Sequence, residues 1–263
     1  MLDASARQSD DDSNLNVPVA LDFLHASAPW DTAMRLAVGT TPEPVPFEKE
    51  RREMIEVQLR RRGIRDERVL EAMFQVPRHE FVPPAFLKAA YEDRPLPIGQ
   101  SETISQPYIV AAMTLAARVE AGDKALEVGT GSGYQAAILA YLGAKLYTVE
   151  RNLQLAEAAR ERLARLKFAG IEVIGGDGSE GYPPAAPYQI ILVTAAAPDV
   201  PPFLLEELAE GGRMVIPVGD LFHQDLLLIL KHHQQVARRV LDPCQFVPLI
   251  GKGGWPERGG PLL

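Results

Sequence analysis

Short apolar runs alternate with helix-forming stretches through the second half of the chain. The apolar runs have strand length and are residues 125–128, 145–149, 171–174, 189–193 and 213–218. Helices are predicted between them at residues 134–140, 153–168 and 201–210, the last closed by Gly211 and Gly212. This alternation predicts an α/β fold, in which a mostly parallel sheet has helices on both faces. Two further strands, residues 224–231 and 244–250, are expected to be antiparallel.

The stretch before these runs predicts additional helices. They are expected at residues 47–62, 66–76 and 83–91, and a fourth runs from Pro107 to about residue 119. The first contains three successive arginines, 60–62, which could bind phosphate. Glutamates interleave with basic residues along that helix, so a solvated face is the favoured interpretation.

Residues 1–46 differ in composition from the rest of the chain. They are rich in Asp, Ser, Ala and Pro, and we predict a flexible extension ahead of one domain formed by residues 47–263. Phe23, Leu24 and Trp30 leave open that part of the extension packs on the domain or on a partner.

Composition excludes several classes of function. A net charge of -8 argues against broad capture of nucleic acid or an anionic membrane. Cys244 is the only cysteine, so an intramolecular disulfide is impossible, and the five histidines have no metal-ligand spacing. The sequence contains no apolar run long enough for a membrane span and starts with an acidic, polar stretch. We therefore expect a cytoplasmic monomer without a metal site.

A glycine turn follows the strand at residues 125–128. Gly129, Gly131 and Gly133 occupy alternate positions, and a helix follows, as in nucleotide-binding βα units. Tyr134 stands where the dinucleotide-binding motif would have its last glycine. The spacing therefore favours a ligand that has no pyrophosphate.

Acidic residues follow the next two strands. Glu150 lies about twenty residues beyond the turn, where a carboxylate can accept hydrogen bonds from ribose hydroxyls. Asp177 is expected to accept from an adenine amino group, with Gly178 leaving room for the base. Alone, each acid would be interpreted as a cap or a solvated charge; together with the glycine turn they predict a ligand site.

Two hydroxyl residues precede the helix that begins at Pro107. Thr103 and Ser105 lie just outside its positive end, where a carboxylate would be stabilised. From this stretch alone, the interpretation that Ser105 only helps to start the helix is equally favoured.

Several sequence blocks resemble protein-L-isoaspartate O-methyltransferases, a family of class I S-adenosylmethionine-dependent methyltransferases. They lie in the same order over about residues 47–255, at 97–100 (Pro-Ile-Gly-Gln), 103–107 (Thr-Ile-Ser-Gln-Pro), 127–135, 149–151 (Val-Glu-Arg), 176–178 (Gly-Asp-Gly), 193–196, 210–212, 216–219 and 246–249 (Phe-Val-Pro-Leu). The resemblance implies a Rossmann-like, doubly wound fold. It also implies Ser105 as the active-site residue and a set of cofactor contacts: Thr103, Ile104, Glu127, Gly129, Thr130, Gly131, Ser132, Gly133, Glu150, Arg151, Asp177 and Gly178.

The family reaction explains why no catalytic His or Cys is needed. A methyl group passes from S-adenosyl-L-methionine to the α-carboxylate of an L-isoaspartyl residue in a damaged protein, leaving S-adenosyl-L-homocysteine, and a carboxylate is already ionised at neutral pH. Two features depart from the family pattern. Glu102 replaces a usual Gln and is expected to repel an anionic substrate, and residues 1–46 have no counterpart in shorter members.

Three alternatives remain open from the sequence. A nicotinamide-dependent oxidoreductase would share the glycine turn and the strand-end acid, although it would need the third glycine. A non-catalytic relative would bind the cofactor only, but its Thr-Ile-Ser segment would be expected to be broken, and here it is intact. A methyltransferase for another carboxylate is the third alternative.

Overall fold

The structure, a computed structural model, describes residues 46–233 and 235–257. The predicted flexible extension therefore lies outside the described residues, apart from Pro46. Val45–Leu263 form one compact unit. Within the described ranges, no helix has the length and apolar character that crossing a membrane would require.

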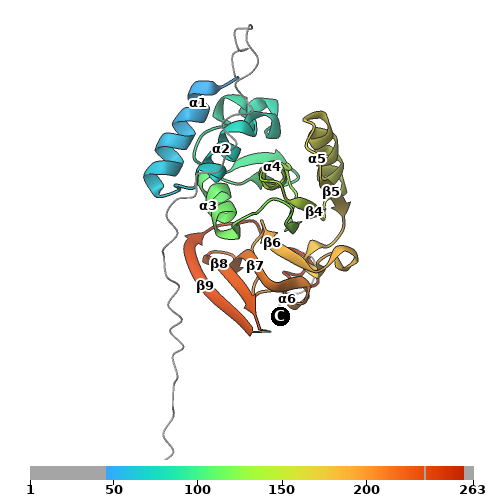
Figure 1. Cartoon of the computed structure of the whole chain (residues 1–263). Coiled ribbons are helices and arrows are strands. Elements are labelled where there is room, and N and C mark those ends of the chain that lie inside the picture. Colours follow the sequence, from blue (N-terminus) through green and yellow to red (C-terminus); the bar gives the residue numbers. More distant parts are fainter. Residues whose placement is uncertain (1–45, 234, 258–263) are drawn as a thin grey trace, which may run out of the picture. The chain divides into compact units, whose positions relative to one another are not determined.

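A seven-stranded sheet with the order β5-β4-β3-β6-β7-β8-β9 organises the unit (Figure 1). The strands are β3 (Lys124–Val128), β4 (Lys145–Glu150), β5 (Ile171–Gly175), β6 (Tyr188–Val193), β7 (Leu208–Gly219), β8 (Gln224–His232) and β9 (Gln235–Cys244). The first five are parallel, and β8 and β9 are antiparallel. After β3 the chain adds β4 and β5 on one side of it, and then β6 to β9 on the other side. The strand order therefore reverses beside β3.

Helices cover both faces of the sheet, which confirms the predicted fold class. The helices are α1 (Glu48–Glu53), α2 (Glu67–Gln75), α3 (Pro107–Ala117), α4 (Tyr134–Tyr141), α5 (Leu153–Arg165) and α6 (Pro202–Glu207). Side chains of α2, α3 and α4 share one core with Ala125 and Ile190, whereas Leu204 of α6 shares the other with Leu126 and Ile191. Adjacent residues of a strand point to opposite faces, so β3 and β6 separate the two cores.

The N-terminal helices agree with the sequence in position but not always in type. The first continues from α1 into a π-helical segment, Met54–Leu59, and a 3₁₀ turn, Arg60–Arg62. The second is α2, whose N-terminus the Asp66 side chain caps, whereas the third helix is only a 3₁₀ segment, Pro84–Ala89. A hairpin of β1 (Leu96–Gly99) and β2 (Glu102–Ile104) follows, which the sequence analysis did not predict.

Two predictions near the C-terminus were wrong. Gly211 and Gly212 do not close a helix but lie inside β7, where the register with β6 shifts and Gly211 has a φ of 75°. The last strand is not 244–250 but β9, which pairs with β8 along an edge of the sheet. Most of β9 is exposed, and Arg238, Arg239 and Asp242 interrupt its apolar residues, so it lacks the apolar run of a buried strand.

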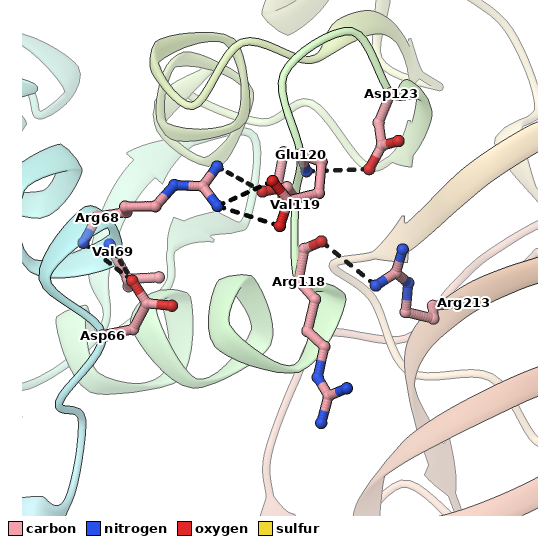
Figure 2. Close-up of polar contacts among 8 residues, drawn as sticks. All are labelled: Asp66, Arg68, Val69, Arg118, Val119, Glu120, Asp123 and Arg213. Carbon is pink, nitrogen blue, oxygen red and sulfur yellow. Dashed lines mark hydrogen bonds and ion pairs between the residues drawn. The ribbon is translucent and has the colours of Figure 1, made fainter. Parts of the chain in front are cut away.

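A cluster of polar contacts joins the N-terminal helices to the sheet (Figure 2). Arg68 of α2 donates to the Val119 carbonyl at 2.8 Å and forms an ion pair with Glu120, both in the segment between α3 and β3. Arg213 of β7 donates to the Arg118 carbonyl at 3.4 Å. The segment that leads into β3 is thus held from both sides.

We predict that deleting residues 1–46 leaves the described unit folded and active. Its cores are formed by residues from Phe47 onward, so the melting temperature should shift little. As a control, Phe47→Ala in the full-length chain should destabilise by about 1–3 kcal/mol, because the Phe47 ring packs against His79 with ring centroids 4.7 Å apart. A large loss of melting temperature on deletion would show that Phe23, Leu24 and Trp30 belong to the domain.

Candidate active site

A cavity, called the inner cavity below, lies beyond the carboxyl ends of β3, β4 and β6, where the strand order reverses. Its walls come from the glycine turn, from the β2 hairpin strand and from the segment after β9. Ten of the thirteen predicted site residues line it: Thr103, Ile104, Ser105, Gly129, Thr130, Gly131, Ser132, Glu150, Arg151 and Gly178. Most of the predicted site residues therefore lie at one cavity, although other residues complete its wall.

The glycine turn lacks room for side chains where it faces β6. Gly129 has a φ of 95°, and a Cβ atom there would lie 2.4 Å from Thr194 Oγ1. That hydroxyl donates to the Gly129 carbonyl at 2.6 Å, so it fixes the turn against the end of β6. A Cβ at Gly178, on the far side, would come within 2.8 Å of Val128 Cγ1. Neighbouring side chains therefore leave room only for glycine at these two positions, and both line the cavity with bare backbone.

Glu150 ends β4 with its carboxylate bound to the glycine turn. It is 8% exposed, and its Oε2 accepts from the Gly131 amide at 2.8 Å. Its Oε1 accepts from the Asn152 amide at 2.9 Å. Each carboxylate oxygen can accept a further hydrogen bond, so Glu150 can bind hydroxyl groups in the cavity while it holds the turn.

Glu127 and Gly133 lie behind the cavity wall and do not line it. Glu127 is 0% exposed and accepts from Thr148 Oγ1 at 2.6 Å, while its Oε1 has no partner among the described residues. Burial raises the pKa of Glu127 to about 8, although the Thr148 hydrogen bond lowers it. A Cβ at Gly133 would lie 3.4 Å from Leu163, so this glycine serves the packing of α5.

Asp177 is not among the residues that line the cavity, and its contact with adenine stays a prediction. Its Oδ1 accepts from the Ser179 amide and hydroxyl, and its Oδ2 accepts from the Lys252 amide at 2.8 Å. The carboxylate thus holds the C-terminal segment in place. Residues 247–250 of this segment line the cavity. No sequence signal linked Asp177 to a residue 75 positions away.

Two charged residues line the cavity near Glu150. Burial, with the neighbouring Glu150 carboxylate, raises the pKa of Glu102. Glu102 lines this cavity and does not line the second cavity, which is described next. Its position therefore gives no support to the predicted repulsion of an anionic substrate. Arg151 also lines the wall and forms an ion pair with Glu257.

A second cavity, called the outer cavity below, lies on the other side of Ser105. Four residues line both cavities: Thr103, Ser105, Thr194 and Val247. The outer cavity is otherwise formed by Arg62, Tyr108, and residues 242–246 at the end of β9 and directly after it, among others. Ser105 directly precedes Gln106, the N-cap residue of α3, as the sequence predicted. Ser105 therefore lies at the wall that the two cavities share.

Some residues of the site were not predicted as such. Thr194 lines both cavities, and its only signal was the Val-Thr-Ala-Ala block at the end of a buried strand. Arg62 lies over the Tyr108 ring, 3.4 Å from its centroid, beside the outer cavity. In residues 46–233 and 235–257 there is no group of three or more His, Cys, Asp or Glu side chains placed to hold a metal ion.

Comparison with known proteins assigns the site to a family. The family model described as protein-L-isoaspartate(D-aspartate) O-methyltransferase matches residues 49–254. The chain belongs to this family. A protein-L-isoaspartate O-methyltransferase of Methanoculleus marisnigri is 54% identical over 83% of this chain and 100% of its own length. One of Koribacter versatilis is 53% identical over 83% of this chain and 98% of its own.

Solved structures agree with the family assignment. A protein-L-isoaspartate O-methyltransferase structure superposes with a TM-score of 0.71 at 28% identity, over 78% of this chain and 67% of the other. A Plasmodium falciparum member in complex with S-adenosyl-L-homocysteine gives 0.68 at 27% identity, over 76% of this chain and 98% of the other. The family predicted from the sequence blocks is confirmed, and with it the Rossmann-like methyltransferase fold.

The buried Glu127 predicts a pH-dependent stability. The folded protein keeps this proton up to about pH 8, whereas the unfolded chain releases it near 4.5. Between those values the folded state binds the extra proton, so the free energy of unfolding falls as pH rises, by up to about 1.4 kcal/mol per unit of pKa difference. Glu127→Gln keeps a neutral acceptor for Thr148 and should flatten the dependence measured by urea unfolding. Parallel pH curves for both proteins would contradict a neutral Glu127.

Proposed function

We propose that this chain is a repair enzyme that methylates the α-carboxylate of L-isoaspartyl residues in damaged proteins, with S-adenosyl-L-methionine as the methyl donor. The observation that carries the proposal is the position of Ser105 at the wall shared by two cavities. One cavity has the features of a nucleoside site, and the other offers a place for the substrate beside it. Family membership supports the same assignment.

The inner cavity fits S-adenosylmethionine, which would supply an electrophilic methyl group. Glu150 would accept from the ribose hydroxyls, and the turn at Gly129–Gly133 would lie against the amino-acid end. Gly178, where a Cβ would meet Val128, leaves space for the base. Glu102 and Glu150 add negative charge that suits a cationic donor and would disfavour phosphates. This charge, and the missing third glycine, count against a nicotinamide cofactor.

The outer cavity would hold the substrate peptide. Thr103 and Ser105 carry hydroxyls at the wall shared with the donor, and α3 begins two residues after Ser105. A carboxylate is favoured at that helix end by the positive dipole and by the Ser105 hydroxyl. Damaged proteins with isoaspartyl residues are the partners this arrangement serves; a monomeric, cytoplasmic protein without nucleic-acid or membrane partners stays a prediction.

Catalysis then consists of orientation. The isoaspartyl α-carboxylate is ionised at neutral pH, so no residue needs to remove a proton from it. Ser105 would orient one carboxylate oxygen towards the inner cavity, and the walls of both cavities would exclude water. The methyl ester is afterwards attacked by the neighbouring backbone nitrogen, methanol leaves, and the resulting succinimide opens partly to normal aspartate.

We predict that Glu150→Gln weakens binding of S-adenosyl-L-homocysteine by about 1–3 kcal/mol, because an amide replaces a charged acceptor in a buried site. Isothermal calorimetry on the folded variant measures the change. Glu172→Gln, on the neighbouring strand and exposed, is the matched control and should bind as the unchanged protein does. Equal affinities for all three proteins would remove Glu150 from the cofactor site.

A second prediction concerns which carboxylate is methylated. In an aspartyl peptide the free carboxylate lies one methylene further from the backbone than in its isoaspartyl twin. A site that fixes the peptide backbone and positions the isoaspartyl carboxylate would therefore misplace the aspartyl oxygen by about an ångström. We expect transfer to the isoaspartyl peptide to be faster by about 10²-fold. Ser105→Ala should lower turnover at least about tenfold without weakening cofactor binding.

Ser101→Ala is the control for this experiment. Ser101 is exposed at the hairpin tip, a few residues from Ser105. Transfer of radiolabelled methyl groups to the paired peptides gives the readout. Methylation of both peptides at one rate, or of another acid only, would reject the repair function and leave a methyltransferase for a different carboxylate.

A further inference from the structure

Arg78 is a completely buried cation that lines neither cavity. It lies in the 3₁₀ segment Arg78–Phe81 and is 0% exposed, whereas arginine is rarely buried without specific partners. Its Nε donates to the Ala90 carbonyl at 2.8 Å, and its Nη2 donates to the Ser105 carbonyl at 2.7 Å. One guanidinium therefore touches the backbone of the proposed active-site residue.

The two carbonyls mark the beginning and the end of one loop. Between Ala90 and Ser105 the chain forms the β1–β2 hairpin, and its Thr103 and Ile104 line the inner cavity. Nε and Nη2 belong to the same edge of the planar guanidinium, and their N–H bonds point in parallel. Arg78 thus closes the base of the loop at a fixed separation, which a single ammonium group cannot do.

The remainder of the guanidinium packs against the cofactor side of the site. Its central carbon lies 4.9 Å from the centroid of the Tyr134 ring, and Tyr134 lines the inner cavity directly after Gly133. Burial lowers the pKa of Arg78 to about 10, so the group stays charged at neutral pH. Its Nη1 is buried and has no hydrogen-bond partner among the described residues. The aromatic face is therefore its compensation on that side.

The residue after Ser105 is held independently. Gln106 Nε2 donates to the Asp93 carbonyl at 3.0 Å, and the Tyr108 amide donates to Asp93 Oδ1 at 3.4 Å. Ser105 is thus held at its own carbonyl by Arg78, and the residues that follow it are held by Asp93. Its backbone therefore has little freedom to rotate, and its hydroxyl stays at the wall that the two cavities share.

We infer that Arg78 is a positioning residue for methyl transfer: by holding the Ser105 carbonyl, it sets the orientation of the Ser105 hydroxyl relative to the donor cavity. This inference rests on the proposed function. The role is indirect, since Arg78 touches neither cavity. It predicts that a change at Arg78 lowers turnover more than it lowers binding of the cofactor product.

Arg51 provides a matched control. It is also buried, at 4% exposure, with one guanidinium nitrogen lacking a partner among the described residues. Its Nη1 donates to the Phe74 carbonyl at 2.9 Å, near the end of α2, and not to the carbonyl of Ser105. Arg78→Lys and Arg51→Lys therefore make the same chemical change in the same core, but only the first releases the Ser105 segment.

The experiment compares both variants with the unchanged protein. For each, calorimetry with S-adenosyl-L-homocysteine counts the folded sites and gives Kd, and turnover of an isoaspartyl peptide is expressed per folded site. Hydrogen exchange of residues 102–106 is measured in parallel. We expect Arg78→Lys to lower kcat by about 10- to 100-fold, with Kd within about threefold, and to speed exchange in 102–106. Arg51→Lys should change kcat and this exchange little.

The outcomes separate the inference from the proposed function. No turnover by the unchanged protein would reject the proposed function, and the exchange of residues 102–106 would still test the anchoring by Arg78. Unchanged kcat and exchange in Arg78→Lys, or equal losses in Arg51→Lys, would overturn the positioning role. If calorimetry finds no folded sites in Arg78→Lys even at low temperature, Arg78 is needed for fold stability, and this result would overturn the positioning role as well.

Discussion

The parallel register of β3 with its two neighbours is the constraint on which the site depends. Val128 pairs with Val149 on one side and with Val193 on the other. The ladder continues one residue further, because the Gly129 amide donates to the Val149 carbonyl and the Thr194 amide donates to the Val128 carbonyl, each at 2.9 Å. Residues far apart in sequence, namely Gly129, Glu150 and Thr194, therefore meet at one edge of the sheet. A change of register by one residue in β3 would turn its core side chains to the opposite face and move Gly129 away from Glu150 and Thr194.

The features that were predictable from the sequence are those with a local cause. The buried strands, the glycine turn and the acid at the end of β4 follow from short apolar runs and from the residues after them, and Asp66 caps α2 as its position indicates. Three features were missed because their causes are tertiary. β9 is an exposed edge strand, the β1–β2 hairpin is too short to have a periodic pattern, and the partners of Asp177 come from the distant C-terminal segment.

Beneath the cavity wall lies a second set of polar groups, which meets the lining of the cavity at Thr130. Glu127 and Thr148 form a buried chain with Thr130, and Arg78 holds two carbonyls within the helical core. Buried polar groups destabilise a fold unless they are hydrogen-bonded, so their presence here marks backbone that apolar packing alone would leave free to move. Motif comparison finds the lining, whereas only the packing identifies this support.

The contact between Gly129 and Thr194 links two positions in the evolution of the site. A methyl group at residue 129 would overlap the Thr194 hydroxyl, and the left-handed backbone at Gly129 would add strain of its own. Shortening the side chain at 194 first would relieve the overlap but release the Gly129 carbonyl from its hydrogen bond. Either single change therefore loses a contact on which the other residue depends, so each of the two positions limits which residue the other can hold.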